Sequence, residues 1–109
     1  MRPSHVDQRA PRILVQIDPD LKEIVPGFLE NRRRDLNTLE GCLQQQDLET
    51  VRLLGHRMKG DGGGYGFARI SEIGHHLEAA ALTRDFATLK DQCAQLKDFL
   101  ARVEVVYKR

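Results

Sequence analysis

The sequence predicts an all-α protein, an antiparallel up-down four-helix bundle with a kinked or broken N-terminal helix. Apolar residues recur at three- and four-residue steps through most of the chain, which is the spacing of one face of a helix. Three of these runs begin at an aspartate, a residue that caps helix N-termini. The connections between runs are short, and short connections favour antiparallel neighbours. No run shows a comparable strand alternation.

The composition limits the class of protein. The chain has 109 residues, which is enough for one domain with a single hydrophobic core. Its hydrophobic fraction of 40% and charged fraction of 30% are typical of soluble globular proteins. The net charge of +1 gives no overall attraction to nucleic acid or anionic lipid. No stretch approaches the roughly 18 apolar residues of a membrane span. We therefore expect a cytoplasmic monomer that binds neither nucleic acid nor membrane.

The N-terminal region precedes the helices. Residues 1–11 are polar, and we expect a disordered tail, so that the folded domain covers residues 12–109. Residues 12–17 form a short, apolar, β-branched segment. We interpret this segment as an extended arm that lies against the domain, because so short a segment cannot form a sheet alone.

The first helix is expected to begin at Asp18 as the N-cap, with Pro19 at the first helical position. Pro26 interrupts the apolar run that follows. Because proline lacks a backbone N–H, it should kink or break the helix and leave a short leading turn. The arginines at positions 32–34 lie between acidic residues, and we interpret them as a solvated helix face. The apolar positions of this run are Leu21, Val25, Phe28, Leu36, Leu39 and Leu43.

Three further helices are expected. Asp47 is the N-cap of the second, the third runs from about residue 68 to residue 83, and Asp85 caps the fourth. Cys42 and Cys93 fall at apolar helical positions, so we interpret them as buried small hydrophobes rather than a disulfide or a metal pair. The fourth run has the clearest amphipathic pattern. Its apolar positions are Phe86, Leu89, Cys93, Leu96, Leu100, Val103 and Tyr107.

A glycine-rich segment follows the start of the second helix. Residues 54–66 read LGHRMKGDGGGYG, with five glycines between positions 60 and 66. In a helix each glycine costs about 1 kcal/mol relative to alanine, so some function should require them. A phosphate-binding loop needs Gly-Lys followed by Ser or Thr after a strand, and the dinucleotide fingerprint G-x-G-x-x-G does not match. A nucleotide site of either kind is therefore poorly supported.

The alternative is that the second helix continues through the glycines. At about 100° per residue, His56 then points almost directly away from the core. Gly60 and Gly63 lie below it on the same outward side and leave the imidazole unobstructed, and Lys59 can bring its ammonium close to whatever binds the ring. This arrangement suits a nucleophile that must meet another protein's surface. The core side of the helix holds Asp47, Val51, Leu54, Met58 and Tyr65.

The motif around His56 resembles a known family. The sequence HRMKG at positions 56–60, with a glycine ten residues after the histidine, resembles the H-x-[LM]-K-G…G signature of histidine-containing phosphotransfer (HPt) domains. The isoleucine at position 70 and the Leu-Glu pair at 77–78 fall where that family carries an apolar residue and a Leu-Glu pair. The resemblance covers about residues 18–106. It departs at position 61, which is often small or weakly polar in the family and is an aspartate here. We expect Asp61 either to act as a cap or to hydrogen-bond within the bundle.

The resemblance implies a phosphoryl carrier of a two-component phosphorelay. His56 would accept a phosphoryl group from a receiver-domain aspartate and pass it on, Lys59 would neutralise part of the phosphoryl charge, and Gly60 would leave room for the partner's active site. The partners would be a response-regulator receiver domain, a hybrid histidine kinase, or both. No cofactor is expected in this chain; the receiver would supply Mg²⁺. Because no acidic pair lies beside His56 to hold Mg²⁺, we expect no autokinase activity and hence no enzyme.

The docking surface is expected on the helix faces beside the histidine. The residues expected to contact a partner are Arg52, Leu53, Arg57 and Gly63, with Leu48 either at the margin or in the core. The alternative hypothesis is a non-catalytic helical adaptor that binds a signalling partner without phosphate transfer. Only the need for an imidazole at position 56 separates the two.

Other polar residues carry weaker signals. His75 is expected to be exposed and His76 to flank the core, and adjacent histidines on a helix do not readily share one metal. Glu78 is expected to make a helix-surface or inter-helix polar contact. A metal or haem bundle is set aside because the inward positions are apolar.

Overall fold

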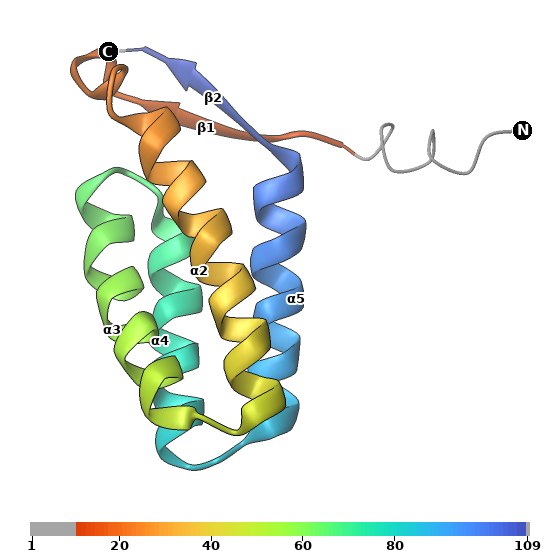
Figure 1. Ribbon diagram of the computed structural model, residues 1–109. Helices are drawn as coiled ribbons and strands as arrows, with labels where there is room; N and C mark the ends of the chain where they lie inside the picture. Colours follow the sequence, from red (N-terminus) through yellow and green to blue (C-terminus); the bar gives the residue numbers. More distant parts are fainter. Residues whose placement is uncertain (1–10, 109) are drawn as a thin grey trace, which may run out of the picture.

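The structure, a computed structural model, describes residues 11–108. The N-terminal tail that we predicted to be disordered, residues 1–11, lies outside this range apart from Pro11. Four helices lie side by side, and consecutive helices are joined by short turns at alternating ends of the bundle (Figure 1). The predicted all-α four-helix bundle is confirmed, with one small sheet added at one end. The elements are β1 (Ile13–Ile17), the 3-10 helix η1 (Pro19–Leu21), α2 (Val25–Gln45), α3 (Leu48–Gly64), α4 (Ala68–Leu82), α5 (Phe86–Arg102) and β2 (Val103–Tyr107).

Two helices begin with the same capping chemistry. The carboxylate of Asp47 accepts hydrogen bonds from the backbone N–H of Thr50 at 3.2 Å and from its hydroxyl at 2.6 Å. The carboxylate of Asp85 accepts the same pair of bonds from Thr88, at 3.1 and 2.7 Å. These bonds hold the pKa of both aspartates below its ordinary value. Both predicted N-caps are therefore confirmed.

The chain before α2 forms a separate short turn. Asp18 caps η1, where its Oδ1 accepts a hydrogen bond of 2.8 Å from the N–H of Asp20. The longer helix α2 begins at Val25, so that Pro26 lies in its first turn. Proline is tolerated there because the first N–H groups of a helix have no intrahelical partner.

The sheet is the main difference from the prediction. β1 pairs with β2 in parallel, with Ile13 opposite Val103 and Ile17 opposite Tyr107. The expectation that the fourth helix includes Val103 and Tyr107 is therefore wrong. The N-terminal segment is extended, as expected, and β2 supplies its partner strand. The sequence VEVVY is rich in β-branched residues that favour strands, and the apolar arm from the other end of the chain supplies its partner strand.

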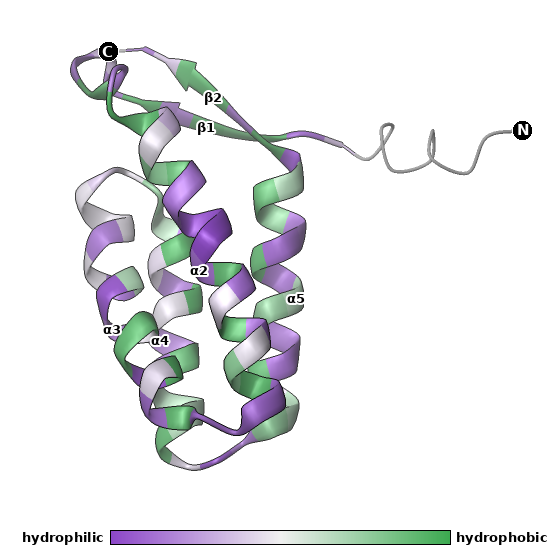
Figure 2. Cartoon of the chain, viewed as in Figure 1, coloured by the Kyte–Doolittle hydropathy of each residue, from purple (hydrophilic) through white to green (hydrophobic). Residues whose placement is uncertain are grey.

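The core lies between the four helices and extends under the sheet. In Figure 2 hydrophobic and hydrophilic residues share each helix, as expected of amphipathic helices. Cys42 and Cys93 are free and buried, as predicted. No helix among residues 11–108 is both long enough and apolar enough to cross a membrane. The largest fully buried side chains are Ile17, Val25, Leu39, Val51, Met58, Phe67, Ile70, Ile73, Leu77, Leu89 and Leu96.

Helices α3 and α4 pack closely because glycines face each other. A Cβ added to Gly55 on α3 would lie 2.8 Å from the backbone nitrogen of Glu78 on α4. A Cβ added to Gly74 on α4 would lie 2.9 Å from the carbonyl carbon of Met58 and would also clash with the backbone nitrogen of Lys59. Without these glycines the two backbones could not approach so closely. The close approach places Glu78 beside the outward face of α3.

Candidate functional site

The glycine-rich segment is helical and presents His56 to solvent. Helix α3 continues to Gly64, as predicted, and the side chain of His56 is 63% exposed. A Cβ added to Gly60 would meet no atom within 4 Å, and one added to Gly63 would meet only the hydroxyl of Ser71, at 4.0 Å. The glycines therefore leave open space on the face that carries the imidazole.

Glu78 on α4 contacts both His56 and Lys59, the histidine and the lysine of the motif. Its Oε2 lies 3.0 Å from Nδ1 of His56, and its Oε1 lies 2.9 Å from Nζ of Lys59. The Glu78 side chain is only 18% exposed, whereas Lys59 is 41% exposed. The bond from Lys59, and after it the bond from His56, lowers the pKa of the Glu78 carboxyl below its ordinary value. At neutral pH the carboxylate is therefore ionised and can only accept hydrogen bonds.

This contact decides which nitrogen of the ring is available. Because an ionised carboxylate has no proton to donate, Nδ1 of His56 must be the donor in the bond to Glu78. In the neutral ring, Nε2 then carries the lone pair. The ring is tied to the protein through Nδ1. Nε2 is the nucleophilic atom that the exposed imidazole offers.

A hydroxyl on α4 fixes the backbone beside Lys59. Ser71 donates a hydrogen bond to the carbonyl oxygen of Lys59. A Cβ added to Gly62, one helical turn further on, would lie 2.9 Å from the carbonyl oxygen of Phe67. The C-terminal half of α3 is therefore held close against α4 by its backbone, while Gly60 and Gly63 leave open space on its outward face.

The predicted partner-contacting residues surround the histidine. Arg52 makes two contacts with the carboxylate of Glu49, of 2.6 and 3.2 Å, and this ion pair raises the arginine pKa. Leu53 is 47% exposed. Arg57 is exposed and makes no ion pair with any residue that the structure describes. Leu48, in contrast, is buried and belongs to the core.

Asp61 lies on the side of α3 that faces α2, whereas Glu78 on α4 approaches α3 from the other side. Its carboxylate is 3.7 Å from Nη1 of Arg32 on α2, which is an inter-helix ion pair and not the cap or hydrogen bond expected of it. Arg32 also contacts Asp35 at 2.9 Å and lies over the ring of Phe28. With only 11% of its side chain exposed, Arg32 is not part of a solvated face, so that prediction is wrong for this residue. The pair connects α2 to the glycine-rich half of α3.

His75 and His76 are the other two histidines within residues 11–108, and they are not part of a metal site. His75 and His76 are both exposed, with ring centroids 5.4 Å apart, so the expectation that His76 flanks the core is wrong. Within the described range no group of three or more His, Cys, Asp and Glu side chains is arranged to hold a metal ion.

The sequence argument missed the role of Glu78. It predicted an inter-helix polar contact, but not that the carboxylate binds both His56 and Lys59. The two residues of the histidine contact are 22 positions apart. The available signal was the Leu-Glu pair at 77–78, read together with the fact that helix α4 must pack beside α3.

Fold and site together define a class of protein: a helical bundle with an exposed histidine that a carboxylate orients and that has a lysine beside it. The Hpt domain family matches residues 23–105, and the chain belongs to this family. No curated protein sequence and no solved structure matches the chain. Hpt domains are phosphocarriers of two-component phosphorelays and interact with receiver domains and histidine kinases.

Proposed function

We propose that this protein accepts a phosphoryl group on Nε2 of His56 from an aspartyl phosphate of a receiver domain and passes it on to another receiver. The observation that carries the proposal is the carboxylate of Glu78, which binds Nδ1 of the exposed ring and the ammonium of Lys59 together. A surface histidine without such a partner would have no fixed tautomer.

The transfer step follows from this geometry. The lone pair of Nε2 attacks phosphorus, a new N–P bond forms, and the bond from phosphorus to the aspartyl oxygen breaks. The electron pair leaves with the aspartate, which becomes a free carboxylate. The phosphorylated ring gains positive charge, and the Glu78 carboxylate at Nδ1 stabilises it. Passing the phosphoryl group on reverses these bond changes.

Lys59 is placed to interact with the phosphoryl oxygens. Its ammonium is already held beside the ring through Glu78, so little side-chain freedom is lost when the oxygens arrive. Phosphoryl transfer depends mainly on positioning and charge stabilisation. In this proposal the receiver supplies Mg²⁺ and the acceptor carboxylate, and this chain contributes the nucleophile and one cation.

The docking surface in this proposal is the outward face of α3. Leu53 offers an exposed apolar contact, and Arg52 and Arg57 add positive charge. Gly60 and Gly63 let the receiver's active site reach the imidazole. A larger side chain at either position would obstruct this approach even though the isolated protein has room for it.

The test uses purified full-length chain and a panel of phosphorylated receiver domains. The wild-type chain is expected to gain an acid-labile, base-stable phosphoryl group, and His56→Gln is expected to gain none. His75→Gln is the matched control, because it removes another exposed histidine, on α4. Equal labelling of wild type and His56→Gln would contradict the proposal. If His56→Gln still binds the receiver and supports the signalling output, the adaptor hypothesis is correct instead.

A further inference from the structure

His56 lies between two basic residues on the outward face of α3. Arg52 precedes it by four positions and Lys59 follows it by three. Residues at these spacings are neighbours on a helix, with Cβ atoms about 5–6 Å apart. Side chains on a helix generally lean toward its N-terminus, which for His56 is the direction of Arg52. Arg57 follows His56 directly in the sequence, but it points about 100° away around the helix axis.

Glu78 connects Arg52 electrostatically to the same site. The pKa of Arg52 is raised mainly by its bond with Glu49, and the negative charge of Glu78 raises it further. The Glu78 carboxylate is the group that lies 3.0 Å from Nδ1 of His56 and 2.9 Å from Nζ of Lys59. One carboxylate on α4 therefore acts on three basic side chains of α3. This agrees with the helical spacing, which places Arg52 on the face that carries the imidazole.

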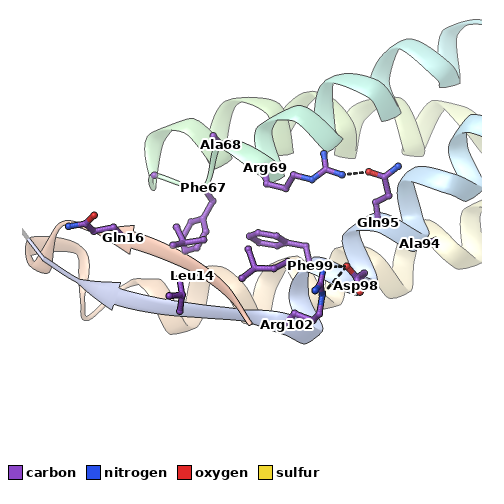
Figure 3. A pocket seen from close by; sticks show the side chains of 13 residues that line it. Leu14, Gln16, Phe67, Ala68, Arg69, Ala94, Gln95, Asp98, Phe99 and Arg102 are labelled. Carbon is purple, nitrogen blue, oxygen red and sulfur yellow. Dashed lines mark hydrogen bonds and ion pairs between the residues drawn. The ribbon is translucent and has the colours of Figure 1, made fainter. Parts of the chain in front are cut away.

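Glu49 holds the Arg52 guanidinium without using all of its nitrogens. Nε and Nη2 of Arg52 donate to the two oxygens of Glu49, at 3.2 and 2.6 Å. Nη1 has no partner among residues 11–108. Arg102, beside the groove between β1, α4 and α5, provides a contrast (Figure 3). Its Nε and Nη2 donate to Asp98, and its Nη1 donates to the carbonyl of Pro11. Arg52 therefore keeps a donor nitrogen for a further acceptor, whereas Arg102 does not.

A phosphoryl group on His56 is an acceptor that suits this nitrogen. It carries about two negative charges and three acceptor oxygens. Lys59 is a single point charge that Glu78 already shares, whereas the flat fork of a guanidinium matches phosphoryl oxygens. The pair with Glu49 does not compete strongly, because the glutamate side chain is 67% exposed and exposed ion pairs are weak. A dianion one turn away therefore attracts Arg52 whether or not Glu49 is released.

We propose that Arg52 is a second phosphoryl-binding residue: when Nε2 of His56 is phosphorylated, Nη1 of Arg52 donates to a phosphoryl oxygen. Arg52 binds the phosphoryl group from the N-terminal side of the ring, and Lys59 binds it from the C-terminal side. This inference rests on the proposed function and gives Arg52 a role beyond adding charge to the docking surface. Its effect is on the stability of the phosphorylated chain and not on the affinity for a receiver.

The equilibrium of transfer from a receiver separates this role from docking. Docking contacts are absent from the separated reactants and products, so they change the rates in both directions and leave the equilibrium constant unchanged. Arg52→Gln should lower the equilibrium ratio of phosphorylated chain to phosphorylated receiver by about two- to fivefold. Glu49→Gln should not lower it, because Arg52 stays and loses only a competing acceptor. Arg33→Gln is the matched control, since Arg33 on α2 also pairs with a glutamate three residues earlier, and the ratio should change by less than about 1.5-fold.

Two results of this experiment would overturn the proposal. Equal falls for Arg52→Gln and Glu49→Gln would show that the ion pair matters only for the structure of α3, because both variants break it. An unchanged ratio for Arg52→Gln, with slower transfer in both directions, would assign Arg52 to docking alone.

A second readout needs no receiver. Phosphoramidate phosphorylates exposed histidines chemically, and replacing the other three histidines by glutamine leaves His56 as the only histidine target. Phosphorylation should shift the ¹⁵N resonances of the Arg52 guanidinium and leave those of Arg33 in place. No shift at Arg52 would overturn the proposal, even if a receiver phosphorylates His56. A shift at Arg52 without transfer from any receiver would support it, while the proposed function would fail.

Discussion

Replacing Gly74 by alanine tests whether the close contact between α3 and α4 places Glu78. The new Cβ would lie 2.7 Å from the carbonyl oxygen of Gly55 and 2.9 Å from the carbonyl carbon of Met58. Both neighbours are backbone atoms, which cannot rotate away as a flexible side chain can. Ordinary contacts of a Cβ begin at 3.4 Å, and the backbone nitrogen of Lys59 would be closer still than these two atoms, so the helices must separate by at least about 0.7 Å.

Alanine also has a higher helix propensity than glycine. Whether the variant is less or more stable therefore depends on which is larger, the cost of separating the helices or the gain in propensity. Overpacking costs about 1–3 kcal/mol. Alanine is favoured over glycine inside a helix by about 1 kcal/mol. The free energy of unfolding should therefore fall by about 1 kcal/mol, which lowers the melting temperature by roughly 4–8 °C in a domain of this size. Urea unfolding followed by circular dichroism measures the difference.

The same separation stretches the contacts of Glu78. The bonds to His56 and Lys59 start at 3.0 and 2.9 Å, and a further ~0.7 Å takes them beyond normal hydrogen-bond length. Phosphoryl transfer from a receiver should slow by about tenfold, an effect typical of losing the group that orients a functional histidine. Gly41→Ala is the matched control, because no atom lies within 4 Å of its Cβ. That variant should gain about 0.5–1 kcal/mol and keep its transfer rate. If Gly74→Ala behaves like Gly41→Ala in both assays, the reasoning is wrong.

Three further results are expected. Glu78→Gln should keep the fold but slow phosphoryl transfer to His56 by about 10- to 100-fold in quenched-flow measurements. The reason is that Nδ1 of His56 and the ammonium of Lys59 both lose their charged partner. An unchanged rate would contradict the role given to Glu78. The pKa values of Asp47 and Asp85 are lowered by folding, so the stability from these caps is present above the ordinary pKa of 3.8 and is lost as the pH falls through the lowered values. The wild type and the double variant Asp47→Asn, Asp85→Asn should therefore differ in urea midpoint at pH 7 and converge in strong acid, and a constant difference would argue against the caps. Burial raises the pKa of the Cys93 thiol to about 11, so iodoacetamide should label it at pH 8 only after unfolding, and rapid labelling of the native chain would show that the thiol is accessible.

Much of the helical bundle follows from local patterns in the sequence. Asp47 and Asp85 each precede a threonine by three residues, and this local chemistry fixes where α3 and α5 begin. The outward direction of His56 follows from the helical period alone. Such features depend on residues within one turn, which is why they could be predicted without the fold.

The parts that could not be predicted depend on residues far apart in the sequence. The strand β2 forms only because β1, from the other end of the chain, pairs with it in register. Val103 and Tyr107 fit a helical period equally well, so the periodicity alone gave the wrong element. In the same way, the contact of Glu78 with His56 depends on how deeply α4 packs against Gly55, which no local pattern specifies.

The proposed chemistry is tested most directly by determining which ring nitrogen of His56 carries the phosphoryl group. After phosphorylation by a receiver, nuclear magnetic resonance of the ¹⁵N-labelled histidine ring distinguishes the two nitrogens. Because Glu78 occupies Nδ1, the phosphoryl group should be found on Nε2 of His56. A phosphoryl group on Nδ1, or on another residue, would contradict the assignment of the nucleophile.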